Sequence, residues 1–158
     1  MLYNLLGRKF EKLEQAATHA WLSASIQTNQ GRIIRFVETN FSKAKGPAAL
    51  DMAKAIRNIS MNPDNSAKAL KIAAKHLSSP KVDKAARKEL SSSVSYAASH
   101  LNNGEINGAK IIEVVKEHYP KASKELKSDL AWALAKVAGV EKHSASAKRL
   151  AEKLRITL

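Results

Sequence analysis

Histidine and acidic residues are the first candidates for chemistry in this 158-residue chain, because they supply general acids, general bases and metal ligands. The chain has five histidines, His19, His76, His100, His118 and His143. No two of them are four residues apart, the spacing that places two ligands on one face of a helix, so a zinc site is not indicated. The chain has no cysteine, which excludes disulfides, thiolate metal sites and a cysteine nucleophile.

Catalytic motifs are also missing from the sequence. The chain contains no GxSxG turn of hydrolases, no phosphate-binding Walker loop and no HExxH of zinc proteases. Asp129 and Trp132 form the one acid–aromatic pair worth considering, and Trp132 lies beside an apolar stripe, where packing in the core or at its edge is expected. We therefore expect a protein that is not an enzyme and needs no metal or cofactor. No small-molecule substrate is indicated.

The excess of positive charge is the least ordinary feature of the composition. Lysine and arginine number 27 against 14 aspartates and glutamates, which gives a formal net charge of +13. Such an excess indicates a polyanionic partner, with nucleic acid first, acidic protein surfaces second and anionic lipid third. Lysine outnumbers arginine about three to one and aromatic residues make up 5% of the chain, so contacts to a phosphate backbone are expected rather than readout of bases.

The composition and the spacing of apolar residues predict helices. Alanine, leucine, lysine and glutamate recur throughout, and four prolines stand where helices would begin, at Pro47, Pro63, Pro80 and Pro120. No segment alternates with a period of two, so an all-α fold of about seven or eight helices without a sheet is predicted. Residues 1–28 are predicted to form one helix. Phe10 and Trp21 lie on or beside its apolar stripe and are candidates for contacting a partner.

Two segments of the chain correspond at a shift of forty residues, residues 79–97 and residues 119–137. The identical pairs are Pro80 and Pro120, Lys81 and Lys121, Lys84 and Lys124, and Leu90 and Leu130. The apolar stripe formed by Ala86, Leu90, Val94 and Ala97 has apolar partners at every equivalent position, Leu126, Leu130, Leu134 and Val137. The helices that precede these segments correspond at a shift of forty-one. The repeated unit is therefore a pair of helices.

A helix pair of about forty residues is the period of HEAT and armadillo units, and the chain resembles HEAT-like α-helical repeats. The resemblance covers two units, 62–101 and 102–140, with a turn at Asn102–Gly108 between them, and a possible divergent unit at 31–61. It implies one helical domain, 1–158, in which residues 1–28 form an N-terminal capping or partner-binding helix and 141–158 a C-terminal capping helix. The alternative is an irregular helical bundle whose two hairpins look alike.

Basic residues recur at matching places in the second helices of the two units. They are Lys81, Lys84, Arg87 and Lys88 in the first, and Lys121, Lys124 and Lys127 in the second. Steps of three and four residues place each set on one helix face, and stacked units would bring the two sets together as a ridge. Such a ridge would bind a polyanion by displacing counterions from its phosphates. The alternative is that these side chains are merely solvated, since Glu89, Glu125 and Asp129 interrupt the face.

The sequence therefore predicts a binding or adaptor module whose lysine-rich helical face engages nucleic acid or a ribonucleoprotein. The alternative is a protein–protein interaction scaffold, an assembly subunit or effector-like adaptor, whose charge is incidental or matched to an acidic partner. The sequence shows no secretory signal and no membrane-spanning segment, so an intracellular, cytoplasmic location is expected. The oligomeric state is not indicated.

Overall fold

Eight α-helices account for most of the residues that the structure describes. The computed structural model describes residues 3–100 and 102–158. The helices are α1 (Leu13–Ser23), α2 (Gln27–Asn40), α3 (Gly46–Ser60), α4 (Pro63–Leu77), α5 (Lys84–Ser99), α6 (Asn103–His118), α7 (Lys124–Ala138) and α8 (Glu141–Leu154). The predicted all-α fold of about eight helices is confirmed. None of these helices is long and apolar enough to cross a membrane.

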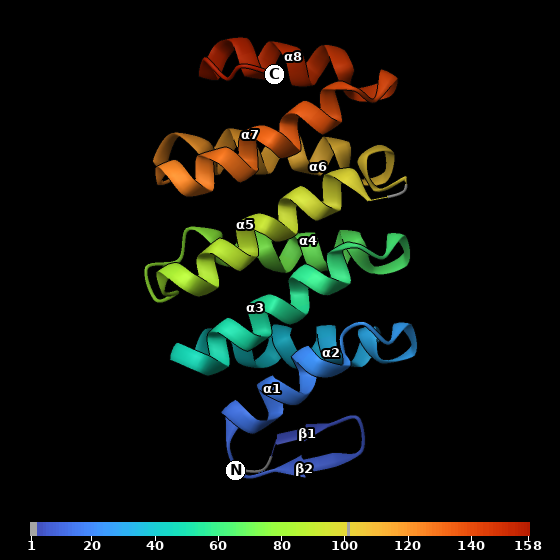
Figure 1. Ribbon diagram of the computed structural model, residues 1–158, viewed down its shortest axis with the longest axis vertical. Helices are drawn as coiled ribbons and strands as arrows, with labels where there is room; N and C mark the ends of the chain where they lie inside the picture. The colour runs from blue at the N-terminus through green and yellow to red at the C-terminus, as the bar shows by residue number, and fades with distance from the viewer. Residues whose placement is uncertain (1–2, 101) are drawn as a thin grey trace.

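The helices alternate between two layers, and the layers run the length of the molecule (Figure 1). Helices α1, α3, α5 and α7 pack against one another in order and form the odd layer, while α2, α4 and α6 lie behind them. Helix α8 contacts both α6 and α7 and ends the stack. The loops that lead from an even helix to the next odd helix lie along one long edge, at the left of Figure 1. The loops that lead from odd to even helices lie along the other.

The predicted apolar stripes form the core between the layers. Leu90 in α5 and Leu130 in α7 are both fully buried, and the remaining members of the two stripes are at most 7% exposed. Alanine supplies much of the rest of the core, which lets helices approach closely because its side chain is a single methyl group. The helix pairs α4–α5 and α6–α7 lie within the predicted units 62–101 and 102–140. The resemblance to HEAT repeats itself stays a prediction.

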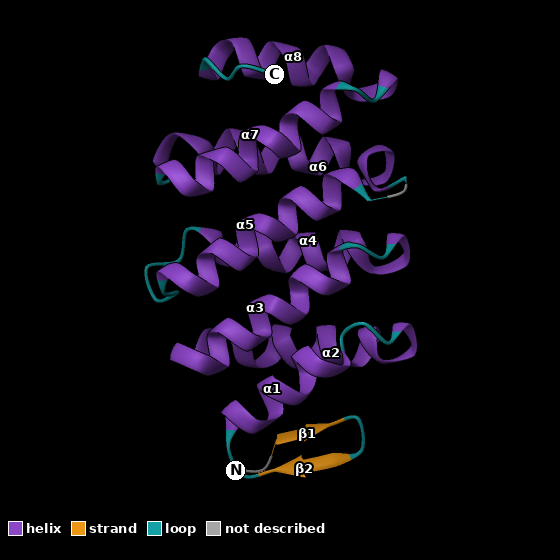
Figure 2. Ribbon diagram, viewed as in Figure 1, coloured by secondary structure: helices purple, strands orange, loops and turns teal. Residues whose placement is uncertain are grey.

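The N-terminal segment differs from its prediction. Residues 1–28 were expected to be one helix and no sheet was expected, but Tyr3–Leu5 (β1) and Arg8–Phe10 (β2) form an antiparallel hairpin before α1 (Figure 2). Leu6 and Gly7 make its turn with φ of 53° and 80°. Asn-Gly is the usual sequence signal for such a turn, and it is missing here. The apolar spacing from Leu6 to Leu13 therefore looked helical.

The segment Asn102–Gly108 is also corrected, because it is not a turn between units but the start of α6. Asn107 Nδ2 donates to Ser66 Oγ at 2.9 Å and to the Ala97 carbonyl at 3.1 Å, and its side chain is buried. A Cβ atom at Gly104 would lie 2.7 Å from the carbonyl oxygen of Ala98. The asparagine and the glycine thus serve close packing of α6 against its neighbours.

Candidate polyanion-binding edge

Six lysines lie in or next to the three loops that lead from an even helix to the next odd helix, and we call this set the lysine edge. Its members are Lys43 and Lys45 before α3, Lys81 and Lys84 before or at the start of α5, and Lys121 and Lys124 before or at the start of α7. All six are exposed. The three loops follow one another along the same edge of the stack (Figure 1). The lysines lie in these loops or on the first residue of the helix that follows, so they are distributed along that edge.

Buried apolar residues hold these loops in place. Phe41 begins the short 3₁₀ turn Phe41–Lys43 and is 2% exposed, and Val82 in the next loop is 6% exposed. A second 3₁₀ turn, Tyr119–Lys121, precedes α7, and Tyr119 packs against the core. Each loop thus has an apolar anchor that points inward, which leaves the lysines on the outer side of the loop.

The opposite edge of the stack carries less of this charge, with Lys136 and Lys142 in the helices next to its last loop. The loops from odd to even helices span residues 24–26, 61–62, 100–102 and 139–140, and they contain no lysine or arginine. Only Lys84 of the lysine edge forms an ion pair among the described residues. Its Nζ is 3.2 Å from Glu125 Oε1, and the two side chains are 82% and 56% exposed. Such an exposed pair contributes little to stability. Asp83 and Glu125 lie among the same loops and helix starts, so the six lysines of this edge outnumber the carboxylates between them.

The structure separates the seven predicted polyanion-binding residues into two groups. Lys81, Lys84, Lys121 and Lys124 lie together on the lysine edge. The other three are engaged within the protein. Arg87 Nη2 donates to the carbonyls of Ser79 and Val82, Lys88 Nζ is 2.8 Å from Asp129 Oδ2, and Lys127 Nζ lies 5.4 Å from the centre of the Tyr119 ring. The row of charge therefore runs along loops and helix starts rather than along a helix face.

Sequence reasoning missed Lys43 and Lys45. Both precede α3, whereas each of the other two pairs ends on the first residue of its helix, and they are separated by one residue instead of two. Neither lysine lies on a predicted helix face of the two clearest units, 62–101 and 102–140. The shared signal is a pair of lysines before or at the start of a helix, close to a proline at Pro47, Pro80 or Pro120.

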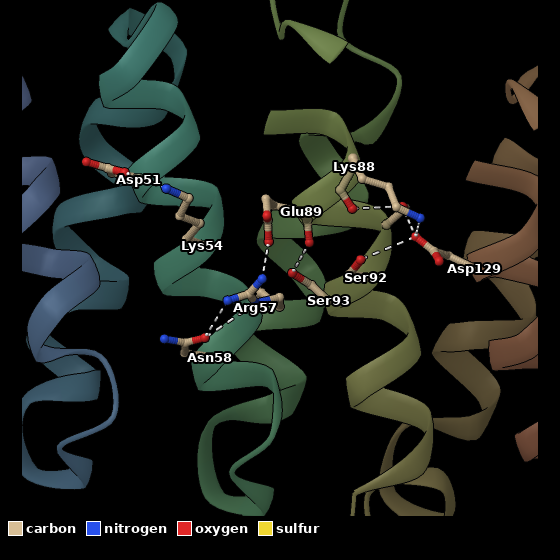
Figure 3. Close-up of polar contacts among 10 residues, drawn as sticks. Asp51, Lys54, Arg57, Asn58, Lys88, Glu89, Ser92, Ser93 and Asp129 are labelled. Atoms are coloured by element: carbon tan, nitrogen blue, oxygen red, sulfur yellow. Dashed lines mark hydrogen bonds and ion pairs between the residues drawn. The ribbon is translucent and has the colours of Figure 1, made fainter. Parts of the chain in front are cut away.

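Ion pairs connect neighbouring helices of the odd layer. Arg57 Nη1 in α3 is 2.7 Å from Glu89 Oε2 in α5, and Lys88 in α5 reaches Asp129 in α7 (Figure 3). Asp129 Oδ2 also accepts hydrogen bonds from the hydroxyls of Ser91 and Ser92. These contacts join α3 to α5 and α5 to α7, and they pair Arg57 and Lys88 with carboxylates.

Removing the Asp129 carboxylate is expected to destabilise the fold. Asp129→Ala should lower the free energy of unfolding by about 1–3 kcal/mol, because the half-exposed Lys88 ammonium loses its carboxylate partner and the buried Ser91 hydroxyl keeps only the Lys88 carbonyl as an acceptor. Urea unfolding followed by circular dichroism measures the change. Glu125→Ala is the control, since its exposed pair with Lys84 should be worth less than about 1 kcal/mol. Equal effects of the two substitutions would contradict the structural role of Asp129.

The two aromatic residues expected to face a partner are both half-buried. Phe10 lies 5.4 Å, ring centre to ring centre, from His19, and Lys54 Nζ covers the Trp21 ring at 4.0 Å from its centre. Trp132, in contrast, is more exposed than expected. It was expected in the core or at its edge, but it is 45% exposed, with Lys136 Nζ 4.9 Å from its ring. Its position follows from the helical period, because Ala133 and Leu134 take the buried side of α7.

Comparisons with protein-family models, curated protein sequences and solved structures found no match to this chain. Within the part of the chain that the structure describes, no three histidine, aspartate or glutamate side chains are grouped so that they could hold a metal ion.

Proposed function

We propose that this chain is a non-enzymatic binding or adaptor module that holds a polyanion, foremost nucleic acid or a ribonucleoprotein, along the lysine edge. One observation carries the proposal. Six exposed lysines lie in three successive loops of one edge or at the helix starts that follow them. The loops on the other edge have neither lysine nor arginine, and only the last of them is flanked by lysines, Lys136 and Lys142. A general surplus of lysine would be expected to place similar numbers of lysines on both edges.

The chemistry of the row fits a phosphate backbone. Each lysine that neutralises a phosphate releases a condensed counterion, so affinity is gained without reading any base. Lysine is a point charge on a flexible stem, which tolerates variation in phosphate position better than a planar arginine fork does. The row therefore suits backbone recognition with little sequence preference.

The experiment that tests this function is a salt titration of binding to duplex DNA, to single-stranded RNA and to heparin. If each of the six lysines contacts one phosphate, the logarithm of the association constant for duplex DNA should fall with the logarithm of salt concentration with a slope of about −5. Single-stranded RNA should give a slope of about −4.

Tighter binding of either nucleic acid than of heparin would support a nucleic-acid module. Equal binding of all three polymers, or no binding near physiological salt, would reject it. In that case an acidic protein partner would become the leading explanation for the charge.

A further inference from the structure

A small basic cavity lies between two neighbouring loops of the lysine edge. Its volume is about 180 Å³, and its polar lining consists of Ser78, Arg87, His118, Lys121 and Ser123. Of the described residues that line it, none is acidic. Pockets for drug-sized ligands usually measure about 300–1,000 Å³, so this cavity suits a small group such as a phosphate.

Arg87 gives the cavity a fixed positive charge. Its Nη2 donates to the carbonyl oxygens of Ser79 at 3.0 Å and Val82 at 2.7 Å, which hold the guanidinium against the loop before α5. No carboxylate pairs with it among the described residues, and its buried Nε has no hydrogen-bond partner. A guanidinium that is immobilised without a counterion is well placed to attract an anion.

His118 and two serines supply hydrogen-bonding groups around that charge. Ser78 Oγ is hydrogen-bonded to His118 Nδ1, which ties the loop after α4 to the end of α6. Burial lowers the pKa of His118 below its usual range, an effect that Glu117 opposes and Lys121 reinforces. The ring is therefore neutral near pH 7, and the charge facing the cavity comes from Arg87 and Lys121.

Ser123 stands where an acid stands one unit earlier. At the shift of forty it matches Asp83, the N-cap of α5, whose carboxylate accepts a hydrogen bond from the Ala86 amide at 2.8 Å. Ser123 is the N-cap of α7, yet its side chain makes no such bond. The first turn of α7 therefore keeps free amide donors next to the cavity, where a bound anion can satisfy them.

A second cavity occupies the matching place one unit earlier along the edge. It measures about 300 Å³, and its lining includes Ser42, His76 and Lys81. By their places in the helices and loops these residues are equivalent to Ser78, His118 and Lys121 of the first cavity. A lysine, a histidine and a serine thus recur at successive steps of the stack. A ligand with phosphates at regular intervals meets this pattern better than an isolated anion does.

We propose that the cavity of Ser78, Arg87, His118, Lys121 and Ser123 binds a phosphate group, and that this group is a backbone phosphate of the nucleic acid that lies along the lysine edge. The second part rests on the proposed function. The cavity would hold one phosphate, while the exposed lysines on either side would neutralise the neighbouring phosphates.

Ser123→Asp tests the cavity without disturbing the fold. Aspartate is as good a helix N-cap as serine, so the thermal midpoint of unfolding should not fall. Its carboxylate would accept hydrogen bonds from the first amides of α7 and would pair with the positive charge of the cavity, so it would compete with a bound phosphate. Ser25→Asp is the matched control, because it makes the same exchange in an exposed loop on the opposite edge. Two probes are used with each variant: inorganic phosphate, followed by the NMR signals of the His118 ring, and a 20-base-pair DNA duplex, followed by fluorescence anisotropy.

The expected result has two parts. Inorganic phosphate should shift the His118 signals of the wild type and of S25D at millimolar concentration but leave those of S123D unchanged. S123D should also bind the duplex at least fivefold more weakly than S25D.

Other outcomes separate the cavity from the proposed function. Equal duplex affinity of S123D and S25D, with no phosphate shift at His118 in the wild type, would overturn the cavity and leave the lysine edge intact. A phosphate shift in a wild type that binds no nucleic acid would support the cavity as a site for free phosphate and overturn the nucleic-acid assignment.

Discussion

A fourfold charge reversal on the lysine edge is expected to lower affinity for nucleic acid by about 10²–10³-fold at 0.15 M salt. The exchanges are K81E, K84E, K121E and K124E. Each lost phosphate contact costs about fivefold at this salt concentration, and the slope of the salt dependence should become shallower by about four units. All four side chains are exposed, so helicity should be unchanged. Anisotropy titrations at several salt concentrations measure both quantities.

A matched variant separates position from net charge. Lys68, Lys71, Lys142 and Lys148 are exposed and lie on α4 and α8, away from the lysine edge. Changing these four to glutamate alters the formal charge by the same amount, so a general electrostatic effect would weaken binding equally in both variants. We expect the control to lose less than about tenfold. Equal losses of affinity in the two variants would show that the net charge acts at long range, and they would contradict binding at the lysine edge.

The helical layers could be predicted because the core depends on local periodicity. Each stripe combines steps of four with a step of three, as from Leu90 to Val94 to Ala97. A helix places all of these residues on one face, whereas the step of three would place Ala97 on the opposite face of a strand. The match between residues 79–97 and 119–137 then indicated the helix pair. Both signals lie within a single helix or a single unit, so they can be found without knowing which distant residues touch.

The hairpin and the start of α6 could not be predicted, because tertiary contacts decide them. Leu5 is 2% exposed in a three-residue strand, too short for an alternating pattern to show. At Asn103 and Gly104 the local preference is for a turn, but buried bonds from Asn103 to the Ser60 carbonyl, together with the close approach of Gly104 to Ala98, stabilise a helix instead. Such partners are about forty residues away or in another helix, where sequence patterns say little.

For the candidate site, the sequence identified four of the six lysines but not their place in the fold. The repeat identified four lysines, Lys81, Lys84, Lys121 and Lys124. It placed them on helix faces, because the helices were expected to begin at the prolines. Pro80 lies in a loop and Pro120 in a 3₁₀ turn, and helices α5 and α7 begin only at Lys84 and Lys124. That delay of four residues moves the first lysine of each pair off the helix and onto the edge. Lys88, by contrast, stays within α5 and meets Asp129.

The largest effect on stability is expected from opening the core between the layers. Leu130→Ala should lower the free energy of unfolding by about 2–5 kcal/mol, because Leu130 is fully buried and its removal leaves a cavity that rigid helices fill only in part. Leu90→Ala, at the equivalent position in α5, should cost a similar amount. Urea unfolding at equilibrium gives both values.

Leu22→Ala is the matched control, since it makes the same exchange at a leucine that is 65% exposed in α1. It should change the free energy of unfolding by less than about 0.5 kcal/mol. A natural domain is stable by only about 5–15 kcal/mol, so the loss at Leu130 would consume a large share of the total. A cost below about 1 kcal/mol at Leu130 would mean that α7 packs loosely. The loops before α5 and α7 would then not be held firmly enough to align their lysines or to shape the cavity between them.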